Sequence, residues 1–242
     1  MTNTTKTSKK FTKKTLGLIL SLVFILGTVF CVPLSASAAE KNTKNQVIYT
    51  DPDYPNETTD TYIAVSQFVS GVTKTSQIKN IKTNSSEVFY KVLSDYSPVH
   101  SGPVILVRAM PSFRGTTKIS FQVGKKTYST NFTVKSYTNP AATLKIGGKN
   151  VAKYANNRTE FMFNSIGTNG TCNLEIKAKS GWVVQQITAY GKHNMFFNVG
   201  VGTQSVSKAL SDFEYLKIVF KNKQTGAYIT LGCHNQGYNG TK

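Results

Sequence analysis

The segment KISFQVGKKTYSTNFTV, residues 118–134, decides the fold class of this chain. Ile119, Phe121 and Val123 alternate with polar residues, so an extended strand places all three side chains on one face. The glycine and two lysines that follow, residues 124–126, supply a turn, and the apolar residues of the return stretch fall into step again. The segment therefore predicts an antiparallel hairpin with one buried face.

A second hairpin of the same kind lies about one hundred residues later. The run YLKIVF at 215–220 leads out, residues 221–226 turn, and residues 227–231 return. The first strands share the pattern Lys-Ile-x-Phe, starting at Lys118 and at Lys217, and the return strands share Tyr-x-Thr at equal offsets. Short runs rich in Val, Ile, Thr, Tyr and Phe fill the chain between these hairpins. We therefore expect an all-β fold of two tandem β-sandwiches.

The strand pattern stops at Asn139-Pro140 and restarts at Leu144, so we expect a domain boundary near Asn139-Pro140. The two predicted sandwiches span residues 46–138 and 142–242, and each span is about the size of one β-sandwich. The segment 205–213 is the exception to the strand pattern, because Val206, Leu210 and Phe213 would share one face of a short helix.

The first 38 residues have the order of a secretory signal peptide. A basic stretch with five lysines precedes an apolar run from Leu16 to Phe30, and Pro33 and small residues follow. Ala36-Ser37-Ala38 offers the cleavage site. The alternative is an uncleaved membrane anchor, against which Pro33 and the small residues argue. We expect an exported, extracellular protein that has no transmembrane segment after cleavage. Association with the cell envelope is a narrower form of the same expectation.

Charge sets limits on the partners of the remaining 204 residues. They keep 24 basic and 11 acidic residues, a net charge of +13, and only Arg108, Arg114 and Arg158 are arginines. Lysine acts as a solvated point charge, whereas specific nucleic-acid recognition favours arginine. We therefore expect no specific nucleic-acid partner. Weak, salt-sensitive attraction to anionic envelope polymers needs only net charge and is favoured instead.

Two cysteines, Cys172 and Cys233, remain after cleavage, because Cys31 leaves with the signal. An exported protein permits a disulfide between them, but nothing in their spacing requires one. A metal site built from Cys172, Cys233 and His234 is the third option, and it lacks the recognisable ligand arrangement of a zinc centre.

Two short motifs in the first half resemble a known family. The first, IKTNSSEVFYKV at residues 81–92, is similar to the V-K-S-S-N-x-x-V-A-x-V segment of bacterial immunoglobulin-like (Ig-like) domains of group 2. The second, GTTKISF at residues 115–121, is similar to the G-T-T-x-I-x-V strand of the same family. The resemblance covers about residues 46–134. Phe89-Tyr90 departs from it, because the family has a small residue there. In the second half, Leu144 to Gly147 and Lys179 to Trp182 look like a companion sandwich found in exported proteins of Gram-positive bacteria. The resemblance implies sandwiches that serve as spacers, stalks or binding modules, with no shared catalytic residues.

Candidate ligand-binding groups fall into two sets. Asp51, Asp53, Glu57 and Asp60 lie within ten residues, and the spacing Asp-x-Asp begins like a calcium loop. Pro55 occupies the next ligand position, so a solvated acidic loop is the preferred interpretation. The four carboxylates of Glu160, Glu175, Asp212 and Glu214 could supply a glycosidase pair, but any four acids would permit that choice.

Trp182, the one tryptophan, opens a predicted strand and is interpreted first as a core residue. The alternative is a sugar-stacking platform that Trp182 forms with Tyr190, Phe196 and Phe197. Because adjacent strand residues point to opposite faces, Phe196 and Phe197 cannot both enter one core, and one of them is the best candidate contact residue.

The sequence thus favours an exported, non-enzymatic Ig-like protein with a binding, adhesion or spacer role at the cell envelope. A carbohydrate-binding module is the first alternative, and it would need an exposed aromatic platform. A small secreted hydrolase is the second, and it would need histidine and carboxylate groups converging in a cleft. We assign no catalytic residue, cofactor or metal. The partner would be an anionic envelope polymer, a glycan or another surface protein.

Overall fold

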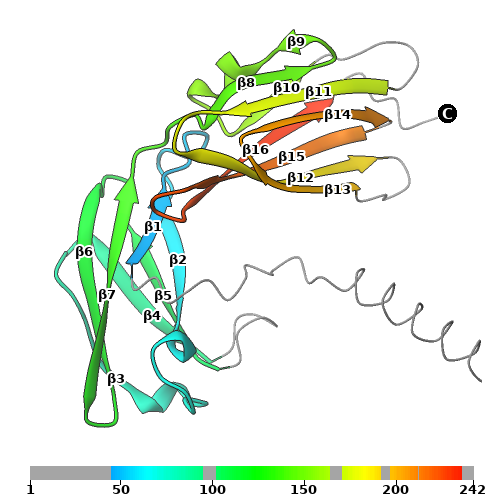
Figure 1. Ribbon diagram of the computed structural model, residues 1–242. Helices are drawn as coiled ribbons and strands as arrows, with labels where there is room; N and C mark the ends of the chain where they lie inside the picture. The colour runs from blue at the N-terminus through cyan, green and yellow to red at the C-terminus, as the bar shows by residue number, and fades with distance from the viewer. Residues whose placement is uncertain (1–44, 95–101, 164–170, 192–196, 212, 236–242) are drawn as a thin grey trace, which may run out of the picture. The chain divides into compact units, whose positions relative to one another are not determined.

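The computed structural model describes residues 45–94, 102–163, 171–191, 197–211 and 213–235 (Figure 1). These residues form strands and three short 3-10 helices, which confirms the all-β prediction. The signal-like segment, Cys31 and the C-terminal tail lie outside the described residues. Within the described part of the chain, no helix is long and apolar enough to cross a membrane.

The first sandwich packs a four-stranded sheet, in the order β1-β7-β6-β3, against a three-stranded sheet, β2-β5-β4. In the lettering of Ig domains these sheets are A′GFC and BED, and β1 runs parallel to β7 as an A′ strand does. The strands are β1 (Asn45–Tyr49), β2 (Thr59–Ala64), β3 (Ile78–Thr83), β4 (Val88–Leu93), β5 (Val104–Ala109), β6 (Gly115–Val123) and β7 (Lys126–Lys135), with 3-10 turns η1 (Val65–Gln67) and η2 (Thr75–Gln77).

The hairpin expected at 118–134 is β6 and β7, and its inward side chains form the centre of the first core. Ile119, Phe121, Phe132 and Val134 are each no more than 2% exposed. Gly124 turns the chain with φ of +59°, a conformation that costs glycine little. The alternation visible in the sequence therefore specifies the buried face of this sheet.

The second sandwich packs a sheet of order β14-β11-β8-β9 against a sheet of order β10-β16-β15-β12-β13. This corresponds to strands E, B and A facing A′, G, F, C and C′, so both sandwiches are Ig-like in strand order. The strands are β8 (Ala141–Ile146), β9 (Lys149–Asn150), β10 (Glu160–Phe163), β11 (Thr171–Ala178), β12 (Trp182–Gly191), β13 (Phe197–Thr203), β14 (Ser205–Ser211), β15 (Phe213–Asn222) and β16 (Tyr228–Asn235), with the 3-10 turn η3 (Ala152–Asn156).

The helix expected at 205–213 is wrong. Residues 205–211 are β14, which pairs with β11 along seven residues from Ser205–Lys177 to Ser211–Thr171. Val206 and Leu210 lie four residues apart, and that even spacing also places them on one face of a strand. The neighbouring strand supplies the backbone hydrogen bonds, so tertiary pairing decides the conformation of this segment.

Asn139 and Pro140, at the expected boundary, are buried. The Asn139 amide group donates to the Ala152 carbonyl at 2.9 Å and accepts from the backbone N–H of Ala141 at 2.9 Å. Tyr137 donates its hydroxyl to the Ala155 carbonyl at 2.6 Å. The segment that leads into β8 is therefore a packed connection that is hydrogen-bonded to η3.

Candidate functional site

A row of four side chains crosses the outer face of the five-stranded sheet. Tyr190, Tyr215, His234 and Met162 occupy matching positions on β12, β15, β16 and β10, in that order across the sheet. The ring centroids of Tyr190 and Tyr215 lie 5.6 Å apart, and those of Tyr215 and His234 lie 4.6 Å apart. Directly opposed residues share a face, so strand pairing assembles this outer row from distant parts of the chain.

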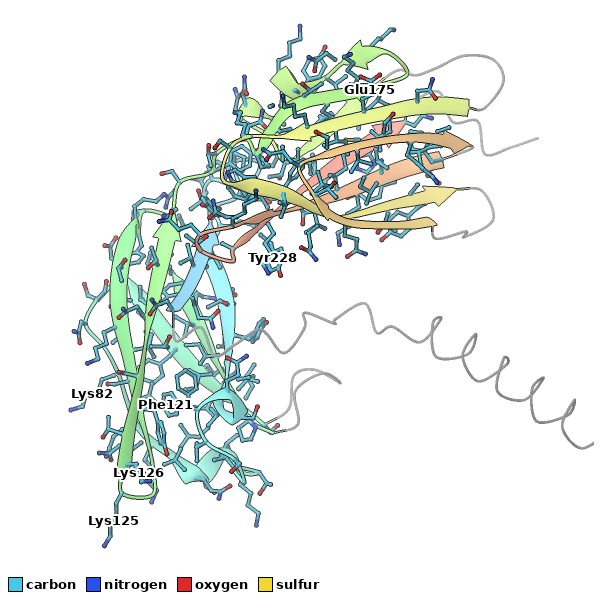
Figure 2. All side chains as sticks on the ribbon, viewed as in Figure 1. Lys82, Phe121, Lys125, Lys126, Glu175 and Tyr228 are labelled. Atoms are coloured by element: carbon cyan, nitrogen blue, oxygen red, sulfur yellow. The ribbon has the colours of Figure 1, made fainter. Side chains whose placement is uncertain are left out.

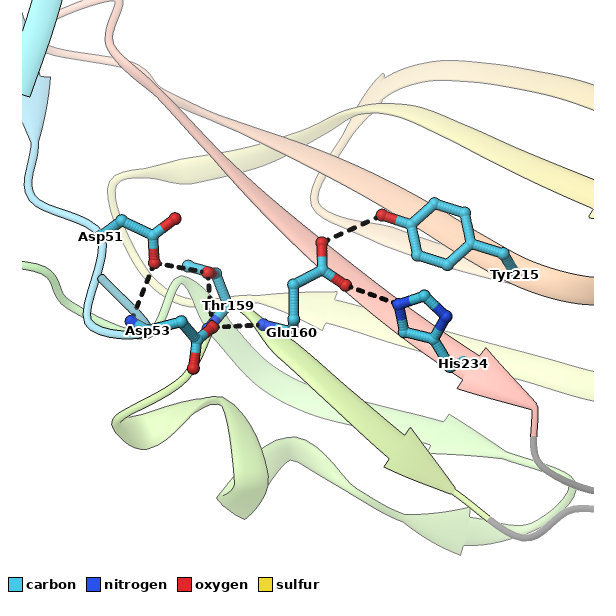
Figure 3. Close-up of polar contacts among 6 residues, drawn as sticks. All are labelled: Asp51, Asp53, Thr159, Glu160, Tyr215 and His234. Carbon is cyan, nitrogen blue, oxygen red and sulfur yellow. Dashed lines mark hydrogen bonds and ion pairs between the residues drawn. The ribbon is translucent and has the colours of Figure 1, made fainter. Parts of the chain in front are cut away.

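Glu160 lies two residues before Met162 and therefore on the same face. Its carboxylate accepts a hydrogen bond from the Tyr215 hydroxyl at 3.1 Å and lies 3.1 Å from His234 Nε2 (Figure 3). Gly232 pairs with Glu160 across the strands, and a Cβ there would collide with the carboxylate. The absence of a side chain at Gly232 thus makes the room in which Glu160 lies.

Burial, followed by the nearby charge of Glu160, raises the pKa of Tyr215 above its ordinary value. The phenol therefore stays protonated at neutral pH and remains a hydrogen-bond donor to Glu160. With Tyr215 on one carboxylate oxygen and His234 beside the other, Glu160 is held in one orientation on the sheet surface (Figure 3).

A groove of about 690 Å³ opens beside Glu160, between η3, β10 and β16. Tyr154 from η3 contributes an aromatic ring that is 47% exposed, and Phe161 lies beneath it with a centroid separation of 6.2 Å. Lys153 Nζ stands 5.4 Å from the centre of the Tyr154 ring. Arg158 and the exposed Met162 also line the groove. The groove thus combines an aromatic face with a fixed acceptor and two cations.

Two acids of the loop after β1 bind the chain just before β10. Asp53 Oδ2 accepts from the backbone N–H groups of Thr159 and Glu160, at 2.6 and 2.7 Å, and from the Thr159 hydroxyl at 2.8 Å. Asp51 Oδ1 lies 2.7 Å from the same hydroxyl (Figure 3). This latch, formed by Asp51, Asp53, Thr159 and the N–H of Glu160, fixes the start of the strand that carries Glu160 and Met162.

The acidic loop is therefore more than the solvated loop the sequence suggested, because Asp51 and Asp53 serve as hydrogen-bond acceptors. Asp60 makes a two-pronged ion pair with Arg108, at 2.7 Å for the shorter contact. Among the described residues, no group of three or more His, Cys, Asp and Glu side chains is arranged to hold a metal ion.

Trp182, a candidate contact residue, is 5% exposed and belongs to the second core. Its ring packs against Tyr49 at 5.4 Å between centroids, so it is a core residue, and it offers no platform for a ligand. Tyr190 belongs to the outer row. Phe196 lies outside the described residues, and Phe197 lies in β13 with a side chain that is not described. Their expected asymmetry stays a prediction.

Cys233 is a free thiol, completely buried in the second core. Burial raises the pKa of this thiol well above its ordinary value, so it stays protonated and unreactive. No bridge is described for Cys233, and the side chain of Cys172 is not described, so the disulfide that the sequence left open stays a prediction. Cys172 lies in β11, which belongs to the other sheet of the sandwich, and the two strands are not paired.

The sequence candidates did not include Tyr154, Met162 and Tyr215, or Lys153 and Phe161 of the groove. Glu160 was one acid among four, and His234 was considered only with the cysteines. The run Glu-Phe-Met-Phe at 160–163 has one polar residue in four, so it indicates a short apolar strand and carries no signal that marks Glu160. The register that brings this strand to His234 is a long-range property, and the sequence alone does not reveal it.

No protein-family model matches this chain, and no curated protein sequence matches it. Among solved structures, the tandem Ig repeats of Dlar align at 13% identity over 79% of this chain and 93% of that one, with a TM-score of 0.30. Domains 5–6 of the S-layer protein SbsC align at 12% identity over 80% and 94%, with a TM-score of 0.26. A titin Ig tandem aligns at 11% over 79% and 93%, with a TM-score of 0.24. At these TM-scores the likeness carries no argument about function, and the Ig-like assignment rests on strand order and pairing.

Proposed function

We propose that this chain is an exported, non-enzymatic Ig-like protein that acts in binding or adhesion at the cell envelope, with its two sandwiches as a spacer. The observation that carries the binding role is the groove beside Glu160, whose volume of about 690 Å³ lies in the range of small-ligand sites. The signal-like segment supports export, and the motifs at 81–92 and 115–121 support a relation to the bacterial group 2 Ig-like domains.

The chemistry of the groove favours binding over catalysis. His234 and Glu160 do converge in a groove, which is the arrangement a hydrolase would need. The described groove lining, however, contains no Ser, Thr or Cys nucleophile and one carboxylate, whereas glycoside cleavage uses two. Thr159, which directly precedes Glu160, is 8% exposed, and its hydroxyl is held by Asp51 and Asp53.

A carbohydrate ligand is the second candidate, and the exposed Tyr154 ring is the observation that favours it. A sugar ring stacks its C–H face on an aromatic ring while its hydroxyls need donors and acceptors at the rim. Here Glu160 is the acceptor, and Arg158 and Lys153 are donors. An aromatic platform on η3 thus takes the place of the one that the sequence offered at Trp182 as an alternative to a core position.

The latch supports the spacer role. Asp51 and Asp53 precede β2 of the first sandwich, whereas Thr159 directly precedes β10 of the second and Glu160 begins it. Hydrogen bonds that join two sandwiches resist independent motion of the two, which is the property a spacer needs. We propose the spans 46–138 and 142–242 as two folding domains joined in this way.

Binding to glycan arrays and to washed bacterial envelopes tests the groove. We expect Tyr154→Ala to reduce binding at least tenfold and Tyr228→Ala to leave it unchanged. Tyr228 is a matched control, because it is 43% exposed in the same sandwich and has Lys221 Nζ 5.6 Å from its ring. Equal binding by both variants and the unsubstituted chain would refute the groove as the binding site.

A further inference from the structure

The four-stranded sheet of the first sandwich contains no acidic residue. Its strands β1, β3, β6 and β7 carry five lysines: Lys79, Lys82, Lys118, Lys126 and Lys135. Each of the other three sheets contains at least one acid, for example Asp60 in β2, Glu175 in β11 and Glu160 in β10. The positive charge of this sheet is therefore not offset by carboxylates on its own strands.

A β-bulge gathers the lysines of β3 onto the outer face. Lys79 and Lys82 are three residues apart and would point to opposite faces of a regular strand. The register shifts between them, and Asn80 adopts φ of +51° and donates from Nδ2 to Gln122 Oε1 at 2.5 Å. Lys79 consequently pairs with Gln122 and Lys82 with Ser120.

Gln122, Ser120 and Lys118 alternate with the buried Ile119 and Phe121, so they all point outward. The paired lysines of β3 share that face with them. Figure 2 shows Lys82 projecting away from the sandwich while Phe121 points into it. On β7, Asn131 lies opposite Lys118, and Lys135 follows four residues later on the same face.

The lysines of this outer face lie at successive levels along the strand direction. Lys79 pairs with Gln122, which pairs with Thr127 of β7, so Lys79 lies at the level of Thr127. Lys135 follows Thr127 by eight residues, and the lysines therefore extend over about 27 Å along the strands. Between the lysines the outward side chains of β6 and β7 are neutral hydrogen-bonding groups: Thr116, Ser120, Gln122, Thr127, Ser129, Asn131 and Thr133. We define Lys79, Lys82, Lys118, Lys135 and these seven residues as the lysine face.

We propose that the lysine face binds a linear, hydrophilic polymer that carries phosphate groups along its backbone. Ammonium groups spaced along a strand can neutralise successive phosphates, and Ser, Thr, Asn and Gln side chains donate to phosphate oxygens between them.

Two other polyanions fit this face less well. A lipid surface would favour large apolar side chains among the cations, and β3, β6 and β7 point lysines and hydrogen-bonding groups outward. Single-stranded nucleic acid would favour exposed aromatic rings for base stacking, and the outward positions of these three strands carry none.

The test compares two triple variants of the purified chain on immobilised inorganic polyphosphate. Lys79→Gln/Lys82→Gln/Lys118→Gln removes charge from the lysine face. Lys149→Gln/Lys177→Gln/Lys208→Gln removes the same charge from exposed positions in the second sandwich. We expect the first triple to weaken binding at least tenfold and to lower the slope of log affinity against log salt by roughly two to three. The control triple and Tyr154→Ala should change neither.

Equal weakening by the two triples would overturn the proposal, because net charge alone would then account for binding. Two further probes compare the alternatives directly. Retention on poly-L-glutamate as strong as on polyphosphate would refute phosphate selectivity. Tighter binding to vesicles containing phosphatidylglycerol, lost in the first triple, would assign the face to a lipid surface instead. Unchanged urea midpoints for both triples would show that they fold.

Discussion

Removal of the Asp53 carboxylate is the most direct test of the latch. Asp53 Oδ2 accepts three hydrogen bonds, two of them from the backbone N–H groups of Thr159 and Glu160. In Asp53→Ala both N–H groups lose their partner, and Thr159 is 8% exposed, so water replaces the carboxylate only in part. The Thr159 hydroxyl keeps its contact with Asp51 at 2.7 Å.

The expected loss follows from those contacts. An unsatisfied buried donor costs about 1–3 kcal/mol, and the substitution creates two such donors, the N–H groups of Thr159 and Glu160, which water reaches only in part. We therefore expect Asp53→Ala to lower the free energy of unfolding by about 2–4 kcal/mol. Asp60→Ala is the matched control, because its ion pair with Arg108 lies at the surface, where exposed pairs contribute little to stability.

Urea unfolding followed by tryptophan fluorescence measures the difference. Trp182 is the one tryptophan of the sequence, and it packs against Tyr49 in β1, close in sequence to the latch. Its emission therefore reports both the second core and its contact with the first sandwich. An Asp53→Ala midpoint that matches the unsubstituted chain, or matches Asp60→Ala, would refute the stabilising role of the latch.

Two further predictions concern the second core and the tyrosines. Trp182→Ala should cost about 3–5 kcal/mol of stability in urea melts followed by circular dichroism. The control, Tyr228→Ala, should stay within about 0.5 kcal/mol of the unsubstituted chain. A near-neutral Trp182→Ala would contradict its core assignment. Burial raises the pKa of Tyr137 and of Tyr215, so their contribution to stability is complete below the unfolded pKa of about 10 and is lost as pH rises above it. Urea melts at pH 9 and pH 11 should therefore show a smaller loss of stability at the higher pH for Tyr137→Phe and Tyr215→Phe than for the unsubstituted chain. Tyr54→Phe, at an exposed position, is the control and should behave like the unsubstituted chain. An equal loss of stability in all four proteins would contradict the expectation.

The sequence by itself determined the class and the faces of the regular strands. Alternation of apolar and polar residues is a local property with a period of two, so Ile119, Phe121 and Phe132 were assignable to the core from their order alone. The burial of Trp182 followed in the same way from its size and place at the start of a strand. Local pattern failed at 205–211, where a helical and an extended spacing coincide and only pairing with β11 decides between them.

Tertiary structure decided everything that depends on register. Glu160, Tyr215 and His234 lie on three strands separated by up to 74 residues, and pairing alone brings them within 3.1 Å. The lysine face likewise depends on one bulge at Asn80, without which Lys79 and Lys82 would point to opposite faces. Both sites are formed by pairing between strands that are distant in the sequence. A shift of one residue in register would move every side chain of a strand to the other face. The candidate sites of this chain therefore become visible only when its strands are placed side by side.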